Sequence, residues 1–320
     1  MTGETTHVPR RRRKLQNLLH TAILVIGMAG LAGVCAWLIW GGVGLVWAAA
    51  AVGFALLFTP TVPPRVLLRL YRARPLDGTG FPDGVALVAG LSRRAGLARQ
   101  PGLYYLPSAT LNAFTVGRPG DCAIAVSDGM LRALDFRELA GVLAHEVSHV
   151  ANHDLRTMAV ADAMSRVTGL LSYFGMVLLI LNLPLVLAGA VTMPWPVVGL
   201  LIFAPTLMSL LQLALSRARE FDADLDAARL TGDPAGLARA LAKIEHRQGR
   251  FWEEILLPGR RMPEPSLLRT HPPTEERVRR LLELKPPVAE PLAGPPAWGP
   301  PSGFAPIATR PRFRRSGLWY

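Results

Sequence analysis

Cysteine is nearly absent from this chain, which has only Cys35 and Cys122 among 320 residues. Cys35 lies in an apolar run and Cys122 in a strand-like stretch, so the sequence favours neither a disulfide framework nor a cysteine-rich zinc site. Acidic residues are also scarce relative to basic ones, at 23 against 35, which gives a formal net charge of +12. We therefore expect no functional role for the thiols and a marked excess of positive charge.

The positive charge is concentrated near the two ends of the sequence. Residues 10–14 read RRRRK, and residues 310–315 contain four arginines. Such clusters can bind nucleic acid, but next to apolar spans they are typical of contact with anionic lipid head groups. We expect a lipid bilayer as a partner and no nucleic acid.

Polar residues are relatively few, because hydrophobic residues make up 50% of the chain and its mean hydropathy is +0.28. This composition is too apolar for an ordinary soluble enzyme. Four apolar runs, residues 18–40, 43–62, 167–191 and 197–215, are each long enough to cross the roughly 30 Å hydrocarbon layer as a helix. A signal peptide has an apolar core of about 7 to 15 residues, well short of the first run. We therefore predict two retained transmembrane hairpins.

The placement of arginine and lysine predicts the orientation in the membrane. Basic residues lie at the outer ends of both hairpins, whereas the short connections at residues 41–42 and 192–196 carry no charge. Positively charged flanks stay in the cytoplasm. We predict a multi-pass protein of the plasma membrane whose functional site and both termini are cytoplasmic.

The polar sequence predicts a mainly α fold with a small β-hairpin, an α+β cytoplasmic domain joined to four transmembrane helices. Residues 110–116 and 122–127 alternate on either side of the turn sequence GRPGD, which is typical of a β-hairpin. Asp135 and Glu138 have the spacing of a capping box and predict a helix that runs to about Asn152. Further helices are expected within residues 77–97, 216–230, 234–247 and 274–284.

These features divide the chain into six segments. A basic arm, residues 1–17, precedes the first hairpin, residues 18–62. The second hairpin, residues 165–215, separates two polar parts of one cytoplasmic domain, residues 63–164 and 216–285. The last segment, residues 286–320, contains nine prolines and no apolar period, so we expect a disordered tail.

A candidate metal motif, HEVSH, occupies residues 145–149 within an otherwise apolar helical run. On a helix, His145 and His149 lie one turn apart on the same face and can both reach one zinc ion. Glu146 is rotated by about 100°, where its carboxylate can take a proton from a zinc-activated water and pass it to a leaving amine. An alternative is a chance HExxH on a solvated helix face. The apolar neighbours argue against it, because ionisable groups in packed surroundings need partners.

A catalytic zinc needs a third protein ligand. His153 continues the histidine stripe, but three residues over two helical turns span about 12 Å and cannot converge on one ion. Glu220 and Asp224 share a face of a later helix, so Glu220 can ligate zinc while Asp224 accepts the second ring N–H of a ligating histidine. The alternative is a charged, solvated helix that leaves the membrane.

The motifs HEVSHVANHD, SRAREFDAD, LNAF and HPPTEERVRRL, placed around two apolar hairpins, together resemble the HtpX-like membrane zinc metallopeptidases, with the CAAX prenyl protease as a more distant relative. The resemblance covers roughly residues 15–285 and implies a gluzincin with a zincin-like domain that binds one Zn²⁺ ion. It implies zinc ligation by His145, His149 and Glu220 and catalysis by Glu146. It also implies that the cleft is lined by the LNAF segment and lies close to His271 and Arg277.

The residues themselves agree with this placement but leave alternatives open. An edge strand that contains Asn112, Ala113 and Phe114 can pair with an extended substrate backbone, although a plain structural hairpin is an alternative. His271 precedes two prolines at a helix start, a position suited to bind a tetrahedral oxyanion. Arg277 is a candidate for substrate binding, or simply one of several basic residues on a surface helix.

The sequence thus predicts a membrane-embedded zinc endopeptidase that acts on protein or peptide substrates, in quality control of membrane or misfolded proteins. One rival is a catalytically silent zinc-binding scaffold or chaperone, which would have no need of Glu146. Another is a metal transporter, but the third and fourth runs offer little polar lining beyond Ser172, Asn182 and Ser209.

Overall fold

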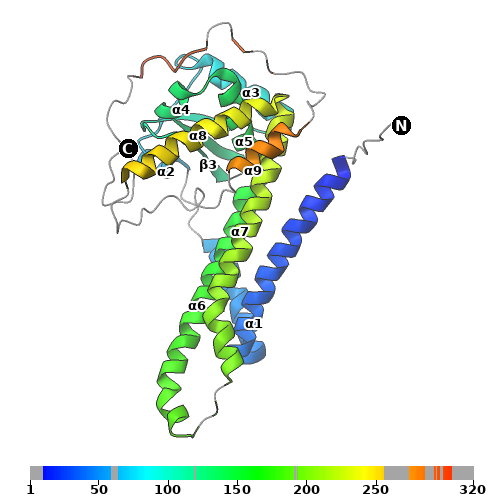
Figure 1. Ribbon diagram of the computed structural model, residues 1–320, viewed down its shortest axis with the longest axis vertical. Coiled ribbons are helices and arrows are strands. Elements are labelled where there is room, and N and C mark those ends of the chain that lie inside the picture. Colours follow the sequence, from blue (N-terminus) through cyan, green and yellow to red (C-terminus); the bar gives the residue numbers. More distant parts are fainter. Residues whose placement is uncertain are drawn as a thin grey trace. The chain divides into compact units, whose positions relative to one another are not determined.

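The computed structural model describes residues 10–58, 64–118, 120–190, 192, 194–255, 274–284, 292, 294–295 and 298–304. They fall into two compact units, one within residues 1–60 and 156–219 and the other within residues 61–155 and 220–320. The elements in chain order (Figure 1) are α1 (Arg10–Phe58), α2 (Pro64–Leu70), β1 (Arg74–Pro75), α3 (Pro82–Ala95), β2 (Gly102–Leu106), β3 (Ala113–Arg118), β4 (Asp121–Ser127), α4 (Asp128–Ala133), α5 (Phe136–Ala151), α6 (Asp154–Leu187), α7 (Trp195–Thr231), α8 (Pro234–Ile255) and α9 (Thr274–Leu282).

Among the residues that the structure describes, three helices are long and apolar enough to cross a membrane: the Leu19–Phe54 part of α1, and helices α6 and α7. We expected four separate spans, and this count is corrected to three. The first two predicted runs fall within α1, as far as the second run is described. At Gly41 the backbone leaves the helical region, with φ 61° and ψ −144°. Glycine adopts this angle readily because it has no Cβ, so α1 bends there into two arms.

The helices of the first unit pack closely through small and polar side chains. A Cβ on Gly44 would clash with the carbonyl oxygen of Ala36, so the two arms of α1 meet beside the kink. The hydroxyl of Ser172 in α6 donates to the carbonyl of Leu201 in α7 at 2.6 Å. Many large apolar side chains of these helices stay exposed, for example Trp47. Such exposed apolar surface is typical of contact with lipid.

The second unit contains a four-stranded mixed sheet in the order β1-β2-β4-β3. Strands β3 and β4 form the predicted hairpin, with antiparallel pairing from Ala113 opposite Val126 to Arg118 opposite Asp121. Strand β2 pairs parallel to β4, so β3 lies at an edge of the sheet. The strand starts later than the predicted residue 110, because Ser127 binds the preceding segment through its hydroxyl and its backbone.

Different elements cover the two faces of the sheet. Ile124 and Val126 belong to the main core, to which α3, α5 and α8 also contribute. Phe114 and Ala125 point to the other face and pack with residues of α2. This alternation follows the period of two along a strand. Thr115 pairs with Ile124 and therefore shares the face that packs on α5.

Helix α5 starts and packs as its sequence requires. The Asp135 side chain accepts from the Glu138 backbone, and the Glu138 side chain accepts from the Asp135 backbone, so the predicted capping box is confirmed. A Cβ on Gly141 would lie 2.8 Å from the backbone of Leu237, so glycine permits the close approach of α8. The cap and the contact fix the rotation and position of the helix that carries the HEVSH motif.

A few described residues of the proline-rich segment pack against the core of the second unit, among them Trp298 and Phe304. The Trp298 ring lies 5.4 Å from the ring of Phe81 and 5.1 Å from that of Phe136. The Phe304 ring lies 4.1 Å from that of Tyr105. A segment without an apolar period can still pack in this way, because widely spaced aromatic residues each find a separate contact.

Candidate metal and catalytic site

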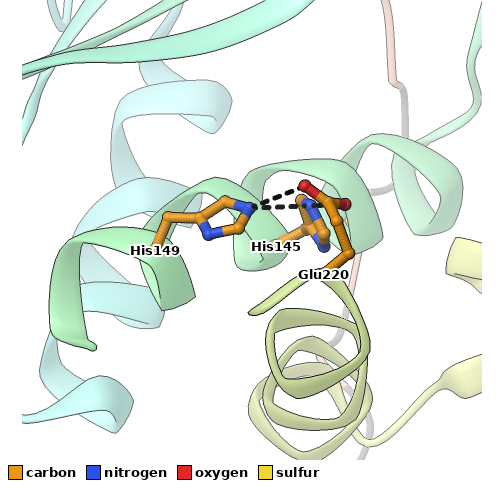
Figure 2. Close-up of side chains that lie close together, drawn as sticks. All are labelled: His145, His149 and Glu220. Carbon is orange, nitrogen blue, oxygen red and sulfur yellow. Dashed lines mark hydrogen bonds and ion pairs between the residues drawn. The ribbon is translucent and has the colours of Figure 1, made fainter. Parts of the chain in front are cut away.

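Three side chains that could hold a metal ion converge from helices α5 and α7 (Figure 2). His145 and His149 lie one turn apart on α5, and Glu220 comes from α7. The Nε2 atoms of the two histidines are 3.0 Å apart. The Glu220 carboxylate lies 3.3 Å from Nε2 of His145 through Oε2 and 3.7 Å from Nε2 of His149 through Oε1. These residues, from segments on either side of the second predicted hairpin, therefore form one cluster.

The spacing of these donor atoms fits a zinc ion. Zinc binds imidazole nitrogen at about 2.0 to 2.1 Å and carboxylate oxygen at about 2.0 to 2.2 Å, so tetrahedral ligand atoms lie about 3.3 Å from one another. The observed separations of 3.0, 3.3 and 3.7 Å bracket that value. Among the described residues, these three form the group of candidate ligands. His145 and Glu220 are buried, whereas His149 is partly exposed.

Asp224 lies behind His145, one helical turn after Glu220. Its Oδ1 atom is 3.0 Å from Nδ1 of His145, an ion-pair contact whose geometry is less favourable than that of a well-aligned hydrogen bond. Burial lowers the pKa of His145, but the contacts with Asp224 and Glu220 outweigh burial and raise the pKa from 6.5 to about 10. Carboxylates that favour a cationic ring also favour a divalent cation at its other nitrogen.

Asp154 has the same relation to His149, and the sequence analysis missed it. Its Oδ2 atom lies 2.7 Å from Nδ1 of His149, and its side chain is buried. Helix α5 ends before it, and His153 takes a left-handed φ of 57° in the turn that leads into α6. The sequence signal was an acidic residue five positions after His149, but helical spacing alone does not bring that position back to the imidazole.

Arg277 of α9 is buried between the two carboxylates of α7. Its Nε and Nη2 atoms donate to the two oxygens of Asp224 at 2.7 and 2.6 Å. Its Nη1 atom lies 3.2 Å from Oε2 of Glu220. Burial lowers the pKa of Arg277, but the charges of Asp224 and Glu220 outweigh it and raise the pKa. The arginine is thus part of the site and not of a solvated helix face.

Glu146 lies beside the donor cluster and contacts the sheet. The hydroxyl of Thr115 in β3 donates to Oε2 of Glu146 at 2.7 Å. Thr115 lies in a predicted strand, but its contact with Glu146 was not predicted from the sequence. The alternation that puts it on the α5 face was the available signal.

The other predicted site residues have different fates. Ala113 and Phe114 lie in the edge strand β3, and Asn112 precedes it, with its backbone bonded to Ser127. His271 lies outside the described residues.

Comparison with known proteins relates most of the chain to peptidases. Residues 85–285 match Peptidase family M48. The chain is 35% identical over 289 residues to a Protease HtpX homolog of Acidiphilium cryptum, an alignment that covers 84% of this chain and 97% of that protein. It is 34% identical over 290 residues to a Protease HtpX homolog of Nostoc punctiforme, which covers 84% and 96%.

A solved structure, the crystal structure of S. mikatae Ste24p, aligns with a TM-score of 0.47 and 16% identity. The alignment covers 83% of this chain and 65% of that protein, so the chain spans a little less than two thirds of its length.

Proposed function

Because the chain belongs to peptidase family M48 and is therefore a metalloprotease, we propose that it is a membrane-embedded, zinc-dependent endopeptidase. The observation that carries this proposal is the convergence of His145, His149 and Glu220 with donor atoms within 4.8 Å of one another. The three residues fit the ligand set that a catalytic zinc requires, which leaves a fourth position for water or substrate.

The remaining side chains prepare this set for its task. A zinc ion bound there supplies Lewis-acid polarisation of a carbonyl and a water of lowered pKa. Asp224 orients the His145 ring and Asp154 orients the His149 ring, each by contact with the Nδ1 atom, so that both Nε2 atoms face inward. Arg277 holds Asp224 and Glu220 in place and offsets their charge repulsion.

Glu146 is the residue that moves the proton. Its carboxylate accepts a proton from the water that attacks the scissile carbonyl and delivers it to the leaving amine nitrogen. Position supports this role, because Glu146 follows His145 in the helix and is a partly exposed residue beside the donor cluster. His271 remains a candidate to bind the oxyanion.

Substrate binding is proposed along β3. The strand lies at an edge of the sheet, so one row of its backbone groups can pair with an extended peptide. Backbone hydrogen bonds depend little on the side chains of the substrate, so this mode of binding suits a peptidase that acts on proteins of varied sequence. Asn112, Ala113 and Phe114 are the residues that we expect to line this cleft.

The cellular setting follows from the apolar helices and the basic flanks. We infer a multi-pass protein of the plasma membrane with a cytoplasmic active site, since arginines flank the outer ends of the apolar runs. A peptidase held at a membrane surface meets membrane and membrane-proximal proteins first. Quality control of such proteins is therefore the role that we propose.

The test is hydrolysis of casein by the full chain in detergent, with zinc content measured on the same samples. Glu146→Gln should keep zinc and lose activity, because the amide cannot take up the proton. Glu283→Gln, at an exposed position on the same unit, is the matched control and should leave activity unchanged. Equal cleavage by both variants would contradict the proposal. A wild-type protein that binds zinc but cleaves nothing would favour the scaffold instead.

A further inference from the structure

Thr115 joins the edge strand to the proposed proton carrier. The strand β3 runs Ala113–Arg118, and Thr115 lies in its middle, 5% exposed. Its hydroxyl lies 2.7 Å from Oε2 of Glu146, a short hydrogen bond to a carboxylate between residues 31 positions apart in sequence. Such charge-assisted hydrogen bonds are about twice as strong as neutral ones.

The bond restricts a side chain that otherwise has considerable freedom. The terminal torsion of glutamate is broad, so an unbonded carboxylate rotates over a wide range. Thr115 itself is stiff, because its side chain is branched at Cβ and held in a paired strand opposite Ile124. A stiff donor can therefore fix the rotation of a mobile acceptor. A carboxylate has about four acceptor sites, so Glu146 can hold this bond and still accept a proton from water.

We propose that Thr115 is a positioning residue that fixes the carboxylate of Glu146 for proton transfer. This inference rests on the proposed peptidase function and adds a residue to it. The strand that would pair with substrate also holds the carboxylate that serves the scissile bond. The strand β3 therefore sets the distance between the bound substrate and the Glu146 carboxylate, and proton transfer depends steeply on that distance.

The test compares three full-length variants in the casein or peptide assay. Thr115→Val keeps the branched shape and the strand preference but removes the hydroxyl, whereas Thr115→Ser keeps the hydroxyl. We expect Thr115→Val to lower kcat about 10-fold with KM nearly unchanged, because only the orientation of Glu146 is lost. Thr115→Ser should keep most of the activity.

The matched control is Thr231→Val, which removes another buried hydroxyl of the same unit. The Thr231 hydroxyl donates to the carbonyl of Ala227 and accepts from the backbone of Asp233, so its bonds lie at the end of α7. It should lower thermal stability without changing the kcat of the folded protein. Zinc content of all variants shows whether the donor cluster survives.

The outcomes separate this inference from the function on which it depends. Unchanged kcat in Thr115→Val, while Glu146→Gln is inactive, would overturn the positioning role and leave the peptidase assignment intact. Loss of activity in both Thr115→Val and Thr115→Ser, or a rise in KM that matches the fall in kcat, would show a structural role for the strand instead. Activity in Glu146→Gln would remove the proposed function itself.

Discussion

Removal of Arg277 gives a quantitative test of how the site is held together. The guanidinium makes two bonds to Asp224, at 2.7 and 2.6 Å, and approaches Glu220 to 3.2 Å. All three residues are at least 94% buried. Arg277→Met keeps much of the apolar volume but removes the guanidinium, so that His145 is the cation left in contact with the two buried carboxylates.

The expected cost follows from the burial of these charges. Removal of one partner from a buried ion pair costs about 3 to 5 kcal/mol, although protonation of a carboxylate limits the loss to the lower end. A domain of this size loses about 2 to 4 °C in Tm per kcal/mol. The metal-free Arg277→Met variant should therefore melt roughly 6 to 12 °C below wild type. Bound zinc replaces part of the missing positive charge, so the zinc-loaded variant should lose less.

The assay is thermal unfolding of the detergent-solubilised chain, followed by tryptophan fluorescence with and without a chelator. Arg279→Met is the matched control, because Arg279 lies on the same helix with a side chain 69% exposed. Its effect should stay within about 1 °C, as exposed ion pairs contribute little. Equal and small shifts in the two variants would refute the proposed role of Arg277 between the carboxylates. A raised KM with unchanged Tm would favour substrate binding by Arg277 instead.

Three further predictions concern the ligands and their supports. Glu220→Ala should abolish stable zinc retention after dialysis, whereas Asp224→Ala should lower zinc affinity by roughly 10- to 100-fold; equal retention in both would contradict the ligand assignment. Asp154→Asn should also weaken zinc binding by about 10-fold, because an amide supports the His149 ring less well than a carboxylate. A competition titration with a zinc chelator measures the affinity, and an affinity equal to wild type would contradict a role for Asp154 in orienting His149. Zinc binding at about pH 7.5 should release nearly one proton from His145, since a pKa of about 10 keeps the metal-free ring charged there, whereas an ordinary histidine is about one-tenth charged. Calorimetry of zinc binding in buffers of different ionisation enthalpy counts the released protons, and release of only about a tenth of a proton would contradict the prediction. The same raised pKa of His145 stabilises the metal-free fold fully below pH 6.5, and this stabilisation is lost as pH rises through about 10.

Local rules in the sequence predicted the elements that carry the site. The capping box at Asp135 marked the start of α5, and helical spacing brought His145 and His149 to one face. Both signals act over one or two turns, so they depend little on the rest of the fold. The hairpin β3–β4 was predicted in the same way from alternation and a turn.

Contacts between distant segments were harder to predict. Asp154 reaches His149 because the chain turns at His153 with a positive φ, which no periodic pattern encodes. The family resemblance placed Arg277 close to the cleft, but the residues alone left a surface helix as an alternative, and only the burial of Arg277 distinguishes the two. The contact of Thr115 with Glu146 could be predicted only if the position of β3 against α5 were known. Each case depends on tertiary packing that one sequence does not specify.

In the apolar part of the chain, the sequence predicted the helices better than the connection between the first two. Length and hydropathy identified the apolar runs but not how the first two are joined. The two glycines between them predicted a break, and the backbone does leave the helical region at Gly41, but both arms belong to one helix, α1. In the proline-rich segment, composition also does not reveal isolated aromatic contacts such as those of Trp298 and Phe304.

The most direct test of the central claim is the location of zinc in crystals of the full chain, from anomalous scattering on either side of the zinc absorption edge. We predict one peak within about 2.2 Å of Nε2 of His145, Nε2 of His149 and a carboxylate oxygen of Glu220. A peak elsewhere, or one bound by the histidines with Glu220 turned away, would contradict the account.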